Sequence, residues 1–303
     1  MIDLRRLRIL RAVAHHGTVT AAAEALHFTP SAASQQIRQL ARELDVTLLE
    51  PQGRGVRLTP AARSLLEHAD AIQARWEQAE VEMRGLGTEP SGPLRVAGFP
   101  VALSRLLAPM AAALHKDYPR LDVRVLESEP GESLDLLFRG DIDLTVLESA
   151  PSTPSLSDTR FEQNPLLEDP LDLLVPDGHR LADRASVPLV ETSRESWILP
   201  PPGTTCRAHA MTACGAVGFT PQGEHQALAW GSVAALVAHG LGVALVPRLA
   251  DLSPDLAVTR VRLEGTPSPS RTLLTFTRAG SRGHPAIAAA VAELERIAPG
   301  AVA

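Results

Sequence analysis

Polar side chains gather on one face of the segment that follows Thr29 and Pro30. At helical spacing this segment places apolar residues on one side and hydroxyl, amide and guanidinium groups on the other. Such groups hydrogen-bond to base edges and phosphates when a helix enters the major groove of DNA. We therefore predict DNA recognition, and the residues expected to contact DNA from this segment are Thr29, Ser31, Ala32, Ser34, Gln35 and Arg38.

A glycine-containing hairpin is predicted shortly after this helix. Strands are expected at 47–50 and 56–58, and the glycines between them place Arg54 at the hairpin tip. There Arg54 can enter the minor groove or meet phosphates, and Arg57 on the second strand is expected to contact DNA as well.

These groups need a framework, which the neighbouring segments supply. A helix of about four turns stops at Gly17, and Thr18 can cap a short second helix. The third helix begins at Thr29, with proline at its first position, and runs to about Leu44. Together with the hairpin, these helices predict a winged helix-turn-helix over residues 1–59.

A long helix of about 27 residues is predicted to begin at Thr59 and Pro60. Its apolar residues alternate spacings of four and three, which implies a partner helix and hence a dimer; packing within one chain is the alternative. Residues 60–92, which end in a run rich in glycine and proline, are assigned as dimerisation helix and hinge. The heptad positions are Leu65, Ala69, Ile72, Trp76, Ala79, Met83 and Leu86.

Strands alternate with helices in the remaining two thirds of the chain. This order predicts an α/β fold with parallel strand pairing and ligand sites at the carboxyl ends of the strands. The expected strands are 94–98, 122–127, 141–147, 171–175, 197–199, 243–246 and 272–277. The expected helices are 102–116, 132–139, one from about 204, 232–239 and 286–297.

Several of these runs resemble LysR-type transcription regulators. The similarity to the DNA-binding head of that family covers residues 21–27, 34–44 and 53–59. The later runs 140–144 and 240–247 are similar to the effector domain of the family, which itself resembles periplasmic binding proteins. The resemblance implies that the chain binds DNA and a small molecule.

Three sites depart from the common pattern of that family. Pro30 and Ser31 stand where many members have Gln-Pro, and Gln35 stands where arginine is frequent. Pro51 stands where the wing often has arginine. The bases that the family prefers, and the contacts that its wing makes with DNA, are therefore not transferred to this chain.

The resemblance further implies a two-lobed effector domain over residues 93–303, with lobe I at 93–164 and 268–303 and lobe II at 165–267. It implies a dimer, and a tetramer such as the family forms. This assembly would bind an interrupted palindrome in double-stranded DNA near a promoter and would contact RNA polymerase there. The effector would bind in the cleft between the lobes. Expected to line that cleft are Phe99, Pro100, Val101, Ser128, Glu129, Glu148, Thr204, Thr205 and Gln226.

Two ligand chemistries stay open for this cleft. The helix start near Thr204 and Thr205 offers free N–H groups and two hydroxyls at the positive end of a helix dipole, which suits a carboxylate. Glu129 and Glu148 would instead favour an amine or a polar neutral ligand.

Cys206 and Cys214 are the only cysteines of the chain. On one intact helix they would lie roughly 12 Å apart, too far for a disulfide. Two buried thiols are the simpler interpretation. A redox-responsive regulator is the alternative, since some relatives sense peroxide with paired cysteines in this general region.

Charge and composition bear on the function class. The formal net charge is −6, yet residues 1–60 carry +3, so the basic character is confined to the DNA-reading end, which a dimer would double. The N-terminus has no signal-peptide pattern, and the uncharged stretch 226–247 suits a buried helix and strand better than a membrane span. A cytoplasmic protein without membrane contact is expected.

Enzyme chemistry has no positive sign in the sequence. We find no familiar metal-ligand spacing, phosphate loop or nucleophile elbow, so no catalytic residue, metal or cofactor beyond the effector is expected. Two other interpretations remain: a two-lobed small-molecule binder or transferase with an oligomerising N-terminus, and an architectural regulator without a ligand.

Overall fold

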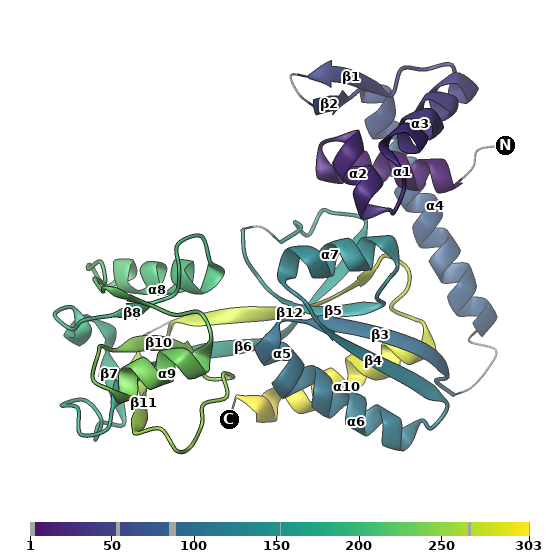
Figure 1. The fold of residues 1–303 in the computed structure, drawn as a ribbon. Coiled ribbons are helices and arrows are strands. Elements are labelled where there is room, and N and C mark those ends of the chain that lie inside the picture. Colours follow the sequence, from purple (N-terminus) through teal and green to yellow (C-terminus); the bar gives the residue numbers. More distant parts are fainter. Residues whose placement is uncertain (1–3, 53–54, 85–88, 152, 266–267, 303) are drawn as a thin grey trace. The chain divides into compact units, whose positions relative to one another are not determined.

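Two compact units build the protein in a computed structural model (Figure 1). The head unit comprises residues 1–87, 157–162 and 278–284, and the effector unit comprises 88–156, 163–277 and 285–303. The structure describes residues 4–52, 55–84, 89–151, 153–265 and 268–302.

Helices and one hairpin make up the head unit. Ala22, Ala23 and Ala33 are fully buried, and their small side chains let the helices approach closely around Leu10 and Leu40. The elements are α1 (Leu4–His16), α2 (Val19–Ala25), α3 (Pro30–Leu44), the antiparallel strands β1 (Leu49–Gln52) and β2 (Gly55–Leu58), and α4 (Pro60–Arg84).

Three threonines cap helices in this unit, as their sequence context predicts. Thr18, Thr29 and Thr59 each accept a hydrogen bond from the backbone N–H three residues further on, at 3.1, 3.2 and 3.1 Å. Pro30 and Pro60 occupy the first helical positions, where a missing N–H costs nothing. These local signals explain why the predicted starts of α3 and α4 are confirmed.

The first strand of the hairpin lies two residues later than predicted. The Thr59 hydroxyl donates to the Thr47 carbonyl at 2.7 Å, and the Thr59 N–H donates to the Leu48 carbonyl. These bonds tie Thr47 and Leu48 to the start of α4, so the ladder runs only from Leu49 opposite Leu58 to Gln52 opposite Gly55. The predicted tip residue Arg54 lies outside the described residues, as does the last heptad residue Leu86.

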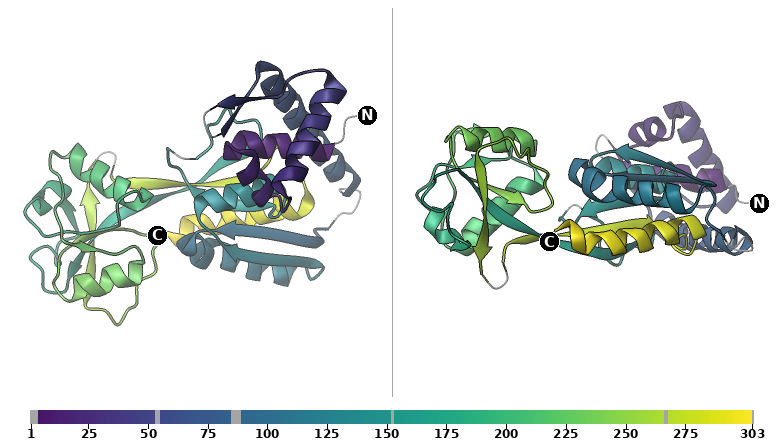
Figure 2. Two further views of the ribbon diagram at one scale, coloured as in Figure 1. Left: turned by 45° about the horizontal axis from the view of Figure 1, so that its top comes forward. Right: turned by 90° about the horizontal axis from the view of Figure 1, so that it is seen from below.

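One sheet runs through the effector unit in the order β4-β3-β5-β12-β6-β11-β7, and β10 also pairs with β6. At one end, β3 (Gly92–Gly98) pairs in parallel with β4 (Leu121–Glu127) and β5 (Leu144–Glu148). Figures 1 and 2 show α7 (Pro130–Arg139) on one face of these strands and α6 (Ala108–Asp117) and α10 (Pro285–Ala301) on the other. The expected helix 102–116 is confirmed in position, with α5 (Pro100–Ala102) and a π-helical turn (Leu103–Leu107) leading into α6.

The two long strands β6 (Phe161–Pro176) and β12 (Ser270–Arg278) connect this end of the sheet to a second group of elements. That group contains β7 (Ser186–Pro188), a 3₁₀ turn (Leu189–Thr192), β8 (Ile198–Leu199), α8 (Thr205–Ala216), β9 (His225–Gln226), α9 (Trp230–Ala238), β10 (Ala244–Pro247) and β11 (Val258–Glu264). The apolar residues form separate clusters at the two ends. We call the end with β3, β4 and β5 lobe I and the other end lobe II.

The prediction of parallel pairing throughout was wrong. β10 and β11 run antiparallel to β6, and β12 runs antiparallel to β5. β7 and β11 were not predicted, and only 171–175 of β6 was, because Pro165 and Pro170 break the apolar pattern there. Among the described residues, every helix is too short or too polar to span a membrane.

Candidate nucleic-acid interface and effector site

The structure sorts α3 into a packing face and an exposed face. Ala33, Ile37 and Leu40 are buried in the head-unit core. Of the predicted DNA-contacting residues, those exposed on this segment are Thr29, Ser31, Gln35 and Arg38, and those half-buried are Ala32 and Ser34. The local reason is the apolar stripe, which turns one side of α3 inwards and leaves polar groups free to meet a groove.

The wing adds one described cation to this surface. Arg57 on β2 is exposed and forms an ion pair with Glu50 on β1, at 2.6 Å between Nη2 and Oε2. Because the pair is exposed to solvent, it is worth little by itself and can exchange for a phosphate contact.

The heptad stripe of α4 divides into a packed part and an exposed part. Ala69 is buried and Leu65 packs against the head-unit core. Further along the helix, Ile72, Trp76 and Met83 have 48%, 53% and 58% of their surface exposed. Large apolar side chains this exposed on one stripe are typical of a face that another helix covers. Within the head unit, packing in the same chain covers only the first part of the stripe.

A chain of charged side chains crosses from lobe I to lobe II, and we call its four residues the interlobe cluster. Glu148 ends β5; its Oε2 accepts a hydrogen bond from Arg271 Nη1 of β12 at 3.1 Å, and its Oε1 pairs with His209 Nε2 of α8. Arg271 Nε donates to Asp169 Oδ2 of β6 at 2.9 Å. Asp169, Glu148 and Arg271 are all buried, so the cluster is held by mutual pairing away from water.

Burial and pairing compete in setting the acidities of this cluster. Burial alone would raise the pKa of Glu148, but the hydrogen bond to His209 and the charge of Arg271 bring it below its ordinary value. For Asp169, burial outweighs the charge of Arg271 and the hydrogen bond from the Leu249 N–H, and the pKa is raised. Pairing therefore dominates at Glu148, whereas burial dominates at Asp169.

Two of the predicted cleft residues meet here, because Glu148 belongs to this cluster and Phe99 contacts it. The Arg271 guanidinium carbon lies 5.4 Å from the centre of the Phe99 ring, within the range of a cation–π contact. A cavity of about 10 Å³ adjoins Arg271 and His209, which is room for one water molecule. It is lined by Leu171, Cys206, His209, Ala210, Trp230, Leu245, Pro247 and Arg271.

Two predicted cleft residues have structural tasks in the effector unit. The Ser128 hydroxyl is buried and lies 2.6 Å from the Ser133 hydroxyl of α7. Thr204 caps α8: its hydroxyl donates to the Pro201 carbonyl at 2.7 Å and accepts from the Arg207 N–H at 3.3 Å. Both hydroxyls are thus engaged in hydrogen bonds within the effector unit.

The other predicted cleft residues surround these two. Val101 is buried in α5, and Pro100 is the first residue of that helix. Glu129 precedes α7 and is exposed, Thr205 is half-buried at the start of α8, and Gln226 is exposed in β9.

Sequence reasoning missed Asp169, His209 and Arg271. Arg271 stands in a run that otherwise reads as a buried strand, and a charge at such a position signals a buried partner. His209 follows Thr205 by one helical turn, so the two share a face of α8.

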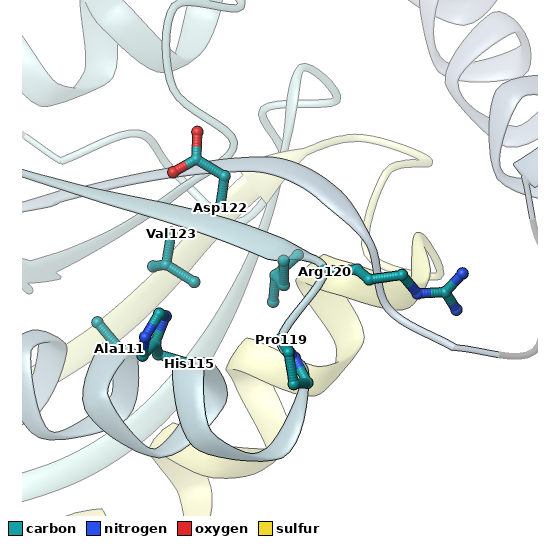
Figure 3. Close-up of a pocket in the computed structure, with 7 residues that line it drawn as sticks. Ala111, His115, Pro119, Arg120, Asp122 and Val123 are labelled. Atoms are coloured by element: carbon teal, nitrogen blue, oxygen red, sulfur yellow. The ribbon is translucent and has the colours of Figure 1, made fainter.

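A larger groove lies elsewhere, on the surface of lobe I between α6 and the edge strand β4 (Figure 3). Its volume is about 450 Å³, and it is lined by Ala111, His115, Pro119, Arg120, Leu121, Asp122 and Val123. None of the predicted cleft residues belongs to it. Among the described residues, no group of three or more His, Cys, Asp or Glu side chains is arranged so that it could hold a metal ion.

Comparison with known proteins decides the family. The family model described as "Bacterial regulatory helix-turn-helix protein, lysR family" matches residues 4–63, and that described as "LysR substrate binding domain" matches residues 87–298. The chain belongs to the LysR family. It is accordingly a LysR-type DNA-binding transcription regulator with an effector-binding domain.

Individual relatives fit this assignment. The transcriptional dual regulator GltC of Bacillus subtilis is 30% identical over 260 residues, with 85% of each chain covered. OxyR of Escherichia coli is 28% identical over 82% of this chain and 80% of its own. Among solved structures, a full-length OxyR mutant from Pseudomonas aeruginosa has a TM-score of 0.65 at 22% identity, covering 99% of this chain and 97% of that one. CbnR in complex with its target DNA has a TM-score of 0.58 at 23% identity, covering 98% and 100%.

The two thiols of this LysR-type regulator lie on one uninterrupted helix, α8. Burial and the charge of Glu148 raise the pKa of Cys206 to about 11, and burial raises the pKa of Cys214 to about 12. A reactive thiol needs a lowered pKa, because the thiolate is the nucleophile.

Proposed function

We propose that this LysR-type regulator reads operator DNA with the exposed face of α3 and with the wing, and that a small effector bound near the interlobe cluster controls this binding. The observation that carries the DNA-reading part is the polar, exposed side of α3 above a fully packed apolar side. The proposed contacts are Thr29, Ser31, Ala32, Ser34, Gln35 and Arg38 on the helix and Arg54 and Arg57 on the wing.

The exposed stripe of α4 supports a dimer. Ile72, Trp76 and Met83 present apolar surface on one side of a long helix, and a second copy of α4 has the same stripe to offer. Two reading helices related by symmetry would bind an interrupted palindrome near a promoter. We extend the proposal to a tetramer of such dimers, acting in the cytoplasm beside RNA polymerase.

An effector that binds without covalent chemistry is favoured over a thiol switch. The relatives named as hydrogen peroxide-inducible genes activators support a redox function. Against it, the raised pKa values of Cys206 and Cys214 keep both thiols protonated at neutral pH, and the intact helix holds them apart. The interlobe cluster instead offers buried charge beside a cavity, and a small polar molecule can reach that charge if a lining side chain moves. We further assign 1–59 to DNA binding, 60–92 to dimerisation and the hinge, and 93–303 to the effector.

DNase footprinting of the protein on the DNA upstream of its own gene tests this proposal. We expect a protected interrupted palindrome and a binding constant that falls steeply with salt concentration. Protection should disappear in a variant in which Ser34, Gln35 and Arg38 are all alanine. A full chain that binds no DNA at low salt would refute the proposal and favour a two-lobed binder or transferase with an oligomerising N-terminus.

The thiol alternative has its own test. Footprints of reduced and peroxide-treated protein should be the same, and so should those of the Cys206→Ser variant. If the footprint changes with peroxide in the wild type and stays constant in Cys206→Ser, the protein responds to a redox signal and the small-effector proposal is wrong.

A further inference from the structure

The interlobe cluster pairs two carboxyl groups with two basic side chains, and only one of the basic side chains is fully buried. Asp169 and Glu148 are two buried carboxyl groups, and Arg271 is the buried guanidinium that both of them share. His209 is the second basic side chain, and it meets Glu148 Oε1 and is the more exposed of the two. Buried charge that lacks a counter-charge is costly, so the position facing Glu148 Oε1 favours a cation.

His209 is the partner of Glu148 that a ligand can replace. Its side chain is 25% exposed, whereas that of Arg271 is 2% exposed and tied to two carboxyl groups. His209 also lines the cavity of about 10 Å³, which is too small for anything larger than water. A larger ligand can enter only if a lining side chain moves, and a movement of His209 would also free Glu148 Oε1.

The start of α8 does not offer an equally good place for an anion. The Thr204 hydroxyl is used twice in capping the helix, as donor to Pro201 and acceptor from Arg207. The negative charges of Glu148 and Glu129 both contribute to the raised pKa of the Cys206 thiol at this helix start. Against the opposing charge of Arg271, these two carboxylates favour a cation over a further negative group near this helix start, which favours the amine of the two ligand chemistries that the sequence leaves open.

A hydrogen-bond donor of Arg271 also lacks a suitable acceptor. Nη2 lies 2.9 Å from Asp169 Oδ2, but that oxygen is aligned with Nε, and Nη2 makes no hydrogen bond of acceptable geometry to the described residues. Arg271 lines the cavity, so an oxygen atom of a ligand there could accept from Nη2.

We propose that the effector is a small organic amine with an oxygen acceptor close to its ammonium group, such as an amino alcohol or an amino acid. The ammonium replaces His209 on Glu148 Oε1, and the oxygen accepts a hydrogen bond from Arg271 Nη2. This inference rests on the proposed effector function of the same cleft. It makes His209 a side chain that competes with the effector, and Glu148 the residue that selects a cation.

Thermal unfolding of the full chain with matched probes tests the ligand class. Ethanolamine and glycine carry both groups, ethylene glycol and acetate lack the ammonium, and ethylamine lacks the oxygen. We expect ethanolamine and glycine to raise the Tm, by about 5 to 10 °C at a hundredfold excess over Kd, and ethylamine to raise it less. If acetate raises the Tm as much as glycine, or if no amine differs from its matched control, the proposal is overturned.

Variants of the two key residues test the mode of binding by calorimetry with ethanolamine. Glu148→Gln keeps the size of the side chain and should weaken binding about 10- to 100-fold. His209→Ala removes the competitor and should tighten binding about 2- to 10-fold, and His209→Gln, which can still donate to Glu148, should tighten it less. Glu127→Gln and His239→Ala change exposed side chains at the ends of β4 and α9 and should leave Kd unchanged.

A merely structural His209 would give weaker or unchanged binding in His209→Ala, and that result would overturn the proposal. Footprinting on the same samples separates this inference from the proposed function. If the protein protects its operator but binds no amine, only the amine proposal is refuted. If the protein binds amines but no DNA, the proposed function is refuted.

Discussion

Replacing Arg271 by methionine should destabilise the effector unit by about 3 to 5 kcal/mol at neutral pH. The substitution keeps most of the side-chain volume and removes the guanidinium. Its loss leaves Asp169, which is fully buried, and Glu148, which is 7% exposed, without their shared cation. The contact of the guanidinium with the Phe99 ring is lost as well, which adds about 0.5 kcal/mol or more.

The pH dependence of this loss has a definite sign. The charge of Arg271 lowers the pKa of both Glu148 and Asp169, so removing it raises both values in the folded protein. A carboxyl group whose folded pKa lies above its unfolded value is penalised at neutral pH and relieved as protons bind. The deficit of Arg271→Met should therefore shrink as the pH falls from 7 towards about 5.

Urea unfolding followed by tryptophan fluorescence measures the loss, because Trp197 is buried in lobe II and reports on its unfolding. The matched control is the triple variant Glu148→Gln, Asp169→Asn, Arg271→Met, which has no unpaired charge and should recover most of the lost free energy. If the single variant matched the wild type at pH 7, or if the triple variant were no more stable than the single one, mutual pairing would not be what holds the interlobe cluster together.

The other predictions concern DNA reading, assembly and helix capping. Gln35→Ala should relax base discrimination at one operator position. Arg57→Ala should instead weaken binding to all DNA sequences and lower the slope of log K against log salt concentration by about 1. Titrations on mutated operators measure both effects, and two variants that behaved alike would contradict these roles. Trp76→Glu should weaken the dimer about 30-fold or more in analytical ultracentrifugation without unfolding the head unit, and an unchanged dimer would place the interface elsewhere. Thr204→Ala should cost about 1 kcal/mol through the lost cap and lower the Tm by roughly 2 to 4 °C, while Thr205→Ala, whose side chain does not cap α8, serves as the control.

Local chemistry made much of the head unit predictable. Threonine followed by proline marks the starts of α3 and α4, because a hydroxyl cap and a proline at the first helical position act within one turn of helix. The face of α3 that packs could likewise be predicted, since Ala33, Ile37 and Leu40 recur at helical spacing. The hairpin register could not, because it depends on bonds from Thr59 to residues more than ten positions earlier.

Less of the candidate effector site than of the head unit could be predicted from the sequence. Phe99 and Glu148 were predicted because both follow strands of lobe I, and strand ends share one edge of a parallel sheet. Their partners lie far away in the chain: His209 is 61 residues from Glu148, and Arg271 is 123 residues from it. Nothing local marks these residues as partners.

The sequence by itself therefore determined that this protein has a DNA-binding helix-turn-helix head and belongs to a two-lobed class of regulator, because caps, stripes and family runs are short-range patterns. Only the tertiary structure decided which charges meet between the lobes. Charged groups become buried together only when β5, β6, β12 and α8 pack into one place, because their residues are far apart along the chain.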